Sequence, residues 1–187
     1  GGGTNAIGGA SVAMGQFTTA IGNVSLAIGN ETTASGDGSV AMGNKTNAVG
    51  PSSFALGVET TAVGEVSVAM GFRTFASGQQ SFAIGNRTFA SGDSSVAMGF
   101  ETSALANYSL AMGEKSTTFG FSSFAMGHTA TASGAYSVAM GRDTSALANN
   151  SLAMGEKSTT SGFSSFAMGY NTTALGSSSV AMGSNTT

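Results

Sequence analysis

Residues 39–66 read SVAMGNKTNAVGPS followed by SFALGVETTAVGEV, two 14-residue segments with one shared pattern of small and large side chains. Both begin with Ser-x-Ala-x-Gly, and this motif recurs at intervals of 14 residues along the chain with no insertion. The motif serines are Ser11, Ser25, Ser39, Ser53, Ser67, Ser81, Ser95, Ser109, Ser123, Ser137, Ser151, Ser165 and Ser179. A fixed period of this kind is the signature of a repeat protein in which each segment is one stacked unit.

The motif itself predicts a β-strand. With the serine numbered position 1, positions 1, 3 and 5 are Ser, Ala and Gly in every copy, whereas position 2 is Val, Leu or Phe and position 4 is Met, Ile or Leu. Alternation of period two places the small and the large side chains on opposite faces of a strand. Because the small face admits nothing large, we expect positions 1, 3 and 5 to line the inside of a thin roll.

The second half of each repeat predicts another strand with a small inner face. Position 8 is Thr, Ser or Ala, position 10 is Ala or Thr, and position 12 is Gly except at Ala106 and Ala148. Positions 6, 7, 13 and 14 are then expected to form turns, which collect charges and proline. Pro51 lies at position 13, and every charged residue lies at position 6, 7 or 13. These are Glu31, Asp37, Lys45, Glu59, Glu65, Arg73, Arg87, Asp93, Glu101, Glu114, Lys115, Arg142, Asp143, Glu156 and Lys157.

The pattern therefore predicts an all-β parallel β-roll, a solenoid of 14-residue turns with two short strands per turn. We expect residues 1–187 to form a single repetitive domain. Its outward positions 2 and 4 would expose on the order of 1,500 Å² of apolar surface, far more than a soluble monomer tolerates. Since this row of side chains is the same on every turn, parallel copies meeting about one axis would cover it. The predicted oligomer core comprises Val12, Met14, Leu26, Ile28, Val40, Met42, Phe54, Leu56, Val68, Met70, Phe82, Ile84, Val96, Met98, Leu110, Met112, Phe124, Met126, Val138, Met140, Leu152, Met154, Phe166, Met168, Val180 and Met182.

Composition disfavours several functional classes. The chain has no cysteine, one histidine and a formal net charge of -3 with six Lys and Arg residues. It therefore offers no thiolate site, no metal cluster, no nucleophile triad and no basic surface for nucleic acid. No apolar run approaches the roughly 20 residues of a membrane helix. We expect no enzyme activity, no cofactor, no nucleic-acid partner and no direct membrane insertion by this segment.

Ser-Val-Ala-Met-Gly, followed by Thr at position 8 and Ala-x-Gly, resembles the YadA-like head of trimeric autotransporter adhesins. The resemblance covers essentially the whole chain. It implies a left-handed parallel β-roll assembled as a parallel homotrimer and displayed at the bacterial cell surface, anchored in the outer membrane through a stalk and a membrane β-barrel absent from this sequence. It also implies a host partner, either an immunoglobulin-like receptor, such as a CEACAM-type protein, or the matrix proteins collagen, fibronectin or laminin.

Aromatic side chains outside position 2 are the candidate contacts for such a partner, because no core explains them. The candidates are Phe72, Arg73, Phe75, Arg87, Phe89, Phe100, Tyr108, Phe119 and Phe121, and Tyr136 and Phe163 belong to the same group as the last three. Phe75 and Phe89 share position 9 on consecutive turns, near Arg73 and Arg87, a combination typical of binding hot spots. Alternatively, turn aromatics pack against a neighbouring subunit. For the chain as a whole, the alternative functions are a structural spacer, an autoaggregation module and a segment of a trimeric phage fibre.

Overall fold

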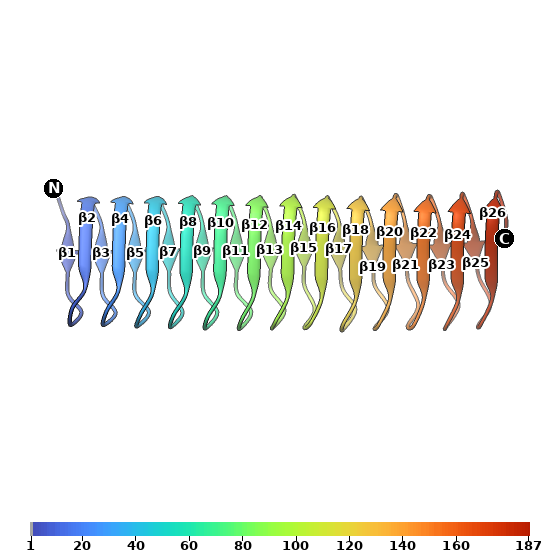
Figure 1. Cartoon of the computed structure of the whole chain (residues 1–187), viewed down its shortest axis with the longest axis horizontal. Coiled ribbons are helices and arrows are strands. Elements are labelled where there is room, and N and C mark those ends of the chain that lie inside the picture. Colours follow the sequence, from blue (N-terminus) through green and yellow to red (C-terminus); the bar gives the residue numbers. More distant parts are fainter. Residues whose placement is uncertain (1) are drawn as a thin grey trace. The chain divides into compact units, whose positions relative to one another are not determined.

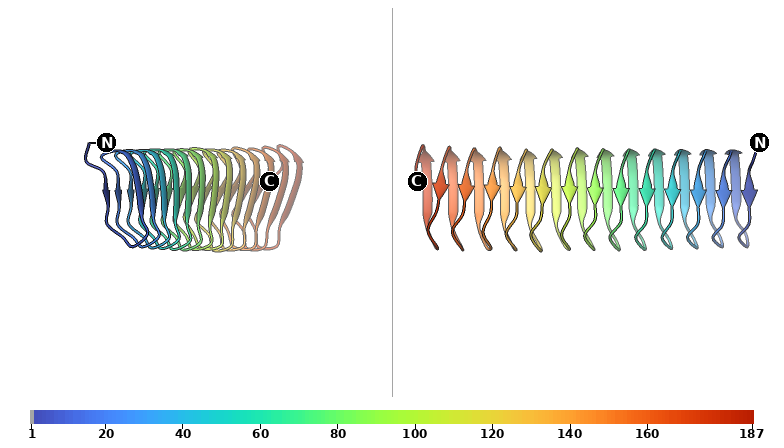
Figure 2. Two further views of the ribbon diagram at one scale, coloured as in Figure 1. Left: turned by 60° about the vertical axis from the view of Figure 1, so that its left-hand side comes forward. Right: turned by 180° about the vertical axis from the view of Figure 1, so that it is seen from behind.

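The computed structural model describes residues 2–187, which form two compact units, residues 2–94 and residues 95–187. Every regular element in the described part of the chain is a β-strand. Each unit contains one sheet of five-residue strands and one sheet of two-residue strands, which run in opposite directions on opposite sides of the unit (Figures 1 and 2). The predicted parallel β-solenoid is therefore confirmed within each unit.

In the first unit the long strands are β2 (Val12–Gln16), β4 (Leu26–Asn30), β6 (Val40–Asn44), β8 (Phe54–Val58), β10 (Val68–Phe72) and β12 (Phe82–Asn86). The short strands are β1 (Asn5–Ala6), β3 (Thr19–Ala20), β5 (Thr33–Ala34), β7 (Asn47–Ala48), β9 (Thr61–Ala62), β11 (Phe75–Ala76) and β13 (Phe89–Ala90). All pairings between successive turns are parallel and join residues 14 apart, as in Val40 with Phe54.

In the second unit the long strands are β14 (Val96–Phe100), β16 (Leu110–Glu114), β18 (Phe124–His128), β20 (Val138–Arg142), β22 (Leu152–Glu156), β24 (Phe166–Tyr170) and β26 (Val180–Ser184). The short strands are β15 (Ser103–Ala104), β17 (Thr117–Thr118), β19 (Thr131–Ala132), β21 (Ser145–Ala146), β23 (Thr159–Thr160) and β25 (Thr173–Ala174). The same register holds here, as in Met112 with Met126.

The interior of each unit is filled by small side chains. The alanines at positions 3 and 10, such as Ala41 and Ala48, are fully buried, and so are the position 8 threonines such as Thr46. Serines at position 1, such as Ser39, are buried beside them. The two sheets therefore lie too close together for a Val or Leu side chain, as the sequence predicted.

Two sequence predictions are wrong in detail. The second strand spans only positions 9 and 10 rather than positions 8 to 12, and position 6 is the last residue of the long strand rather than part of a turn. The second strand is shorter than predicted because inward and outward alternation continues through the extended residues that flank it, and a strand ends where pairing ends. Position 6 belongs to the long strand because its backbone pairs with the next turn, as Asn30 does with Asn44, although several copies carry a charge there. Side chains at positions 2, 4 and 6 consequently share the outward face.

The position 5 glycines are also not interior residues, contrary to prediction, because each of them is either half-buried or exposed. They have φ near +130°, for example +129° at Gly43, a conformation that side chains rarely adopt. A Cβ built on Gly43 would lie 1.9 Å from the carbonyl oxygen of Gly57 on the next turn. Glycine is required here by the close approach of successive turns and by this backbone conformation, not by burial.

The corners between strands are formed by residues in the left-handed conformation. Positions 7 and 14 have φ between +51° and +58° even where the residue is not glycine, as at Glu59 and Val66. Their amides are held by the preceding turn, since Glu59 N donates to Asn44 O and Val66 N donates to Pro51 O, each at 2.9 Å. Hydrogen bonding between turns thus continues around the corners as well as along the strands.

Replacing Gly43 with Ala should destabilise the protein by about 3 kcal/mol or more, because the new Cβ meets a backbone oxygen and the φ value is strained. Gly38→Ala is the matched control: its φ of +66° is close to the values at other position 14 residues, and its nearest neighbour is a Ser52 side-chain oxygen at 3.6 Å. That change should destabilise the protein by only about 1–2 kcal/mol, the usual cost of the left-handed conformation for a residue with a Cβ. Urea unfolding of both variants at one protein concentration measures the difference, and equal midpoints would contradict the assignment.

Candidate functional site

The outward face of the long strands carries a continuous row of large apolar side chains in each unit. We call the position 2 and position 4 residues of the long strands the apolar stripe. They alternate along each strand with fully buried alanines, and most are half-buried, because each one packs against its counterpart on the neighbouring turn. Met98 and Met168 are among those still exposed. All the residues predicted for an oligomer core lie on this face.

Polar side chains at position 6 form a border to the apolar stripe at the ends of the long strands. In the first unit the amide of Asn30 donates to Gln16 and the amide of Asn44 donates to Asn30, each at 3.1 Å. In the second unit oppositely charged or titratable groups stack instead, with Glu114 3.7 Å from His128. The chain uses both a neutral ladder and a charged ladder at the same position, so this border has different electrostatics in the two units.

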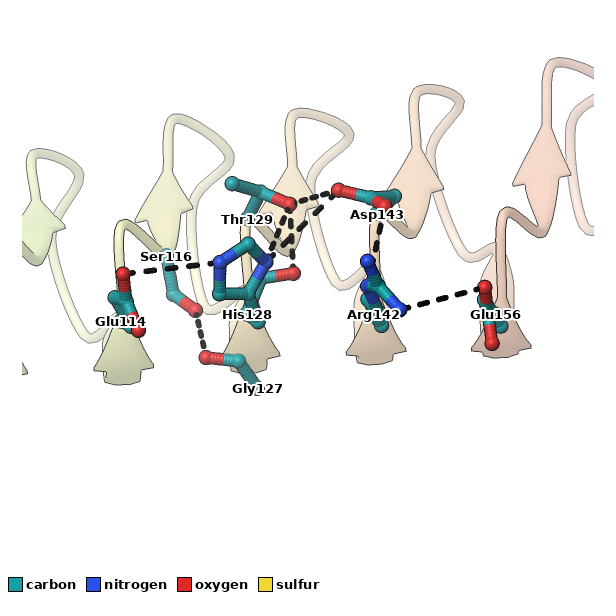
Figure 3. A network of polar contacts seen from close by, with 8 residues as sticks. All are labelled: Glu114, Ser116, Gly127, His128, Thr129, Arg142, Asp143 and Glu156. Atoms are coloured by element: carbon teal, nitrogen blue, oxygen red, sulfur yellow. Dashed lines mark hydrogen bonds and ion pairs between the residues drawn. The ribbon is translucent and has the colours of Figure 1, made fainter.

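Figure 3 shows the charged ladder continuing onto the adjacent corner, where the hydroxyl of Thr129 donates a hydrogen bond to the carboxylate of Asp143. Arg142 lies 3.7 Å from Asp143 and 3.8 Å from Glu156. The Thr129 hydrogen bond lowers the pKa of Asp143 from its ordinary value, and electrostatic interactions with Arg142, His128 and Lys157 lower this pKa further. The Asp143 carboxyl group is therefore ionised throughout the neutral range.

The first group of predicted contact residues lies in the unit formed by residues 2–94. Phe75 and Phe89 are direct partners on adjacent short strands, as predicted, with Phe89 exposed and Phe75 half-buried. Arg73 makes a 2.6 Å ion pair with Glu59, and its guanidinium carbon lies 4.9 Å from the centre of the Phe72 ring. Arg87 also has an interaction partner. The charged groups of this surface are thus already engaged within the chain.

The second group lies in the unit formed by residues 95–187. The Tyr108 and Phe121 rings pack edge to face with their centres 5.4 Å apart. Phe121 and Tyr136 do the same at 5.7 Å. Phe119 is exposed on the outward side beyond the short strand, and Phe100 is exposed at the end of β14. The structure therefore brings Tyr108 and Phe121 together and extends the row to Tyr136.

Exposed aliphatic residues at position 11 were not predicted as candidate contacts. Leu105 and Leu147 are both exposed there, on the same side of the roll as Phe119. The signal was present in the sequence, because position 11 is the one outward position beside the short strand that admits Ile, Val, Leu and Phe as well as Ser. Position 11 therefore carries a second, smaller group of apolar side chains outside the apolar stripe.

No pocket is present in either unit, and no three His, Asp or Glu side chains of the described chain come together in a way that could hold a metal ion. No helix able to cross a membrane occurs among these residues. The most prominent surface features of the described residues are the apolar stripe and the exposed aromatic side chains outside it.

Comparison with protein families gives one match, to the family described as YadA head domain repeat (2 copies). The match falls on residues 24–46, 64–88, 90–116, 120–144 and 161–186, which together make up more than half of the chain. Each matched stretch includes a long strand and at least one short strand of the roll. A search of curated proteins found no match to this sequence.

Replacing Thr129 with Val should raise the pKa of Asp143 towards its ordinary value, since the hydrogen bond to the carboxylate is the main cause of the lowered pKa. A carboxyl group with a lowered folded-state pKa stabilises the fold above its unfolded pKa of about 3.9, and this contribution is lost as the pH falls through the folded value. The variant should therefore lose stability relative to the parent at neutral pH, but not below the folded pKa. NMR titration of the Asp143 carboxyl carbon, with Thr131→Val as control, measures the shift. An unchanged Asp143 titration would refute the assigned cause.

Proposed function

The chain belongs to the YadA head family, and from that premise we propose that it is the host-binding head of a homotrimeric adhesin on a bacterial surface. One observation supports the proposed homotrimer: large apolar side chains line the outside of a roll whose inside holds only small ones. In a protein with a conventional core this arrangement would be reversed. The apolar stripe therefore needs a partner surface, and identical chains in register supply one that matches at every turn.

Membership of the YadA head family supports a role as a surface-exposed autotransporter adhesin, and the described surface fits that role. Folding of each unit uses positions 1, 3, 8, 10 and 12, whereas a trimer would use positions 2 and 4. The corners and the outward face of the short strands are then left for other molecules. Three copies would present three identical faces, so that weak individual contacts reinforce one another through avidity. The proposed host partners are an immunoglobulin-like receptor of CEACAM type, collagen, fibronectin or laminin.

A spacer or autoaggregation role is the second proposal for the same assembly. The turns of both units repeat with little variation in backbone, as expected of a rod that separates other parts of a protein. The exposed aromatic residues favour the adhesin instead, because a spacer has no use for solvent-exposed Phe and Tyr side chains at its corners. That residues 1–187 form one continuous head domain also remains a prediction.

The trimer is tested by placing charge in the apolar stripe. Met98 and Met112 are direct partners on β14 and β16, and replacing both with Asp should dissociate or unfold the protein, since each buried carboxylate costs several kcal/mol. The control is Ser103→Asp with Thr117→Asp, a partner pair on the short strands of the same two turns. Sedimentation velocity should report a trimer for the parent and the control only. A folded monomeric parent, or a trimeric Met98→Asp, Met112→Asp variant, would overturn the proposal.

The adhesin proposal predicts that the unmodified head binds at least one of collagen, fibronectin, laminin or a CEACAM-type ectodomain in surface plasmon resonance. Raising the density of the immobilised host protein should tighten the apparent affinity by about 100-fold, because three sites can then engage together. A surface coated with serum albumin is the control. Absence of binding to all four proteins would favour the spacer.

A further inference from the structure

The most exposed cluster of rings outside the apolar stripe lies at one corner of the second unit. Tyr108, Phe121 and Tyr136 occupy this corner on successive turns, with 60%, 44% and 58% of their surface exposed. Phe119, at 56%, and Leu105 lie beside them at position 11 on the outward side of the short strands. We call these five residues the aromatic corner. No interior of the chain accounts for them.

The rings of the aromatic corner are held in place before any partner arrives. Tyr108 and Tyr136 have φ values of +58° and +56°, which fix the direction in which each side chain leaves the backbone. Tyr136 N donates to Phe121 O at 2.8 Å, and the rings pack edge to face with interplanar angles of 74° and 76°. A rigid aromatic surface loses little conformational entropy on binding.

The aromatic corner carries no charge. Every charged residue from Glu101 to Lys157 lies at position 6 or 7, at the opposite corner of the turn, and positions 8 to 14 of this unit contain none. Neutral polar groups lie among the rings instead, such as Ser122 and the side chain of Asn149, which accepts a hydrogen bond from Ala135 N at 2.9 Å. Tyr, Ser and Asn on a rigid scaffold are also the residues that dominate antibody binding surfaces.

The corresponding surface of the first unit is less suited to binding a partner. Arg73 is held by Glu59 at 2.6 Å and lies over Phe72, so a partner would have to displace or desolvate an existing ion pair. Phe75 is half-buried and Phe89 is 43% exposed, whereas Tyr108, Tyr136 and Phe119 are 56% to 60% exposed. The aromatic corner offers more accessible ring surface and has no charged group that a partner would have to desolvate.

We propose that the aromatic corner is the receptor contact of the adhesin, and that its partner is a folded protein with an uncharged apolar patch bordered by hydrogen-bonding groups. This inference rests on the proposed adhesin function. A partner that relies on acidic or sulfated groups does not fit, because the corner has no cation to bind them. Binding should depend on apolar contact and should be insensitive to salt.

The decisive variants replace the rings with residues that the chain itself uses at equivalent positions. Tyr108→Ser, Phe121→Asn and Tyr136→Ser copy Ser122 and Asn107 in neighbouring turns, so the triple variant should fold. Phe75→Thr with Phe89→Thr is the matched control and copies Thr61. Binding is measured against whichever of collagen, fibronectin, laminin and a CEACAM-type ectodomain the parent binds. The triple variant should weaken Kd by about 30-fold or more, and the control by less than about 3-fold.

Further measurements separate the outcomes. Raising NaCl from about 0.15 M to about 1 M should change the parent's Kd by less than about 3-fold, and heparin should not compete. Binding that survives the triple variant, or that salt weakens more than about 10-fold, refutes the assigned surface and leaves the adhesin intact. A triple variant that sediments as monomer shows that the aromatic corner is a subunit contact and overturns the inference. Failure of the parent to bind any of the four proteins defeats the adhesin itself.

Discussion

The close approach of backbones is the constraint on which the rest of this structure depends. Successive turns are so near that a Cβ on Gly43 would meet the carbonyl oxygen of Gly57, and the two sheets of a turn are separated by fully buried alanines. A roll this thin obtains its cohesion from hydrogen bonds between turns rather than from a core of large side chains. Burial of Ala contributes far less per residue than burial of Leu or Phe.

The thin interior determines where the large side chains go. Val, Leu, Phe and Met cannot fit inside, so they occupy the outward face of the long strands, where the next copy of the chain would complete a core that a single chain lacks. Methionine suits such an inter-subunit core, since its flexible side chain fills irregular gaps. All ten methionines of the sequence lie at position 4. The apolar stripe supports the proposed oligomer, and membership of the YadA head family favours a trimer.

Much of the fold could be predicted from the sequence, because internal repetition reports what each position tolerates. The invariance of Ser, Ala and Gly identified a small face, and the alternation with Val and Met identified the outward stripe. The glycines at position 5 were misplaced because invariance alone does not distinguish a residue buried among side chains from one with φ near +130° against the next backbone. The candidate contacts were foreseen as exposed rings. Which rings touch, as Phe121 does with Tyr108 and Tyr136, could not be read from position numbers.

The corners explain how such a regular fold can carry a specific surface. Their backbone is fixed by hydrogen bonds to the preceding turn and adopts φ near +55° whether the residue is Glu, Val, Tyr or Ser. The side chain at a corner is therefore almost independent of the fold, and it can change from turn to turn at little cost in stability. In the second unit every charged side chain lies at position 6 or 7, whereas the aromatic corner carries none, so the same backbone presents two chemically different edges. Specificity in this architecture is a matter of which turns carry which corner residues, while the interior and the stripe stay constant.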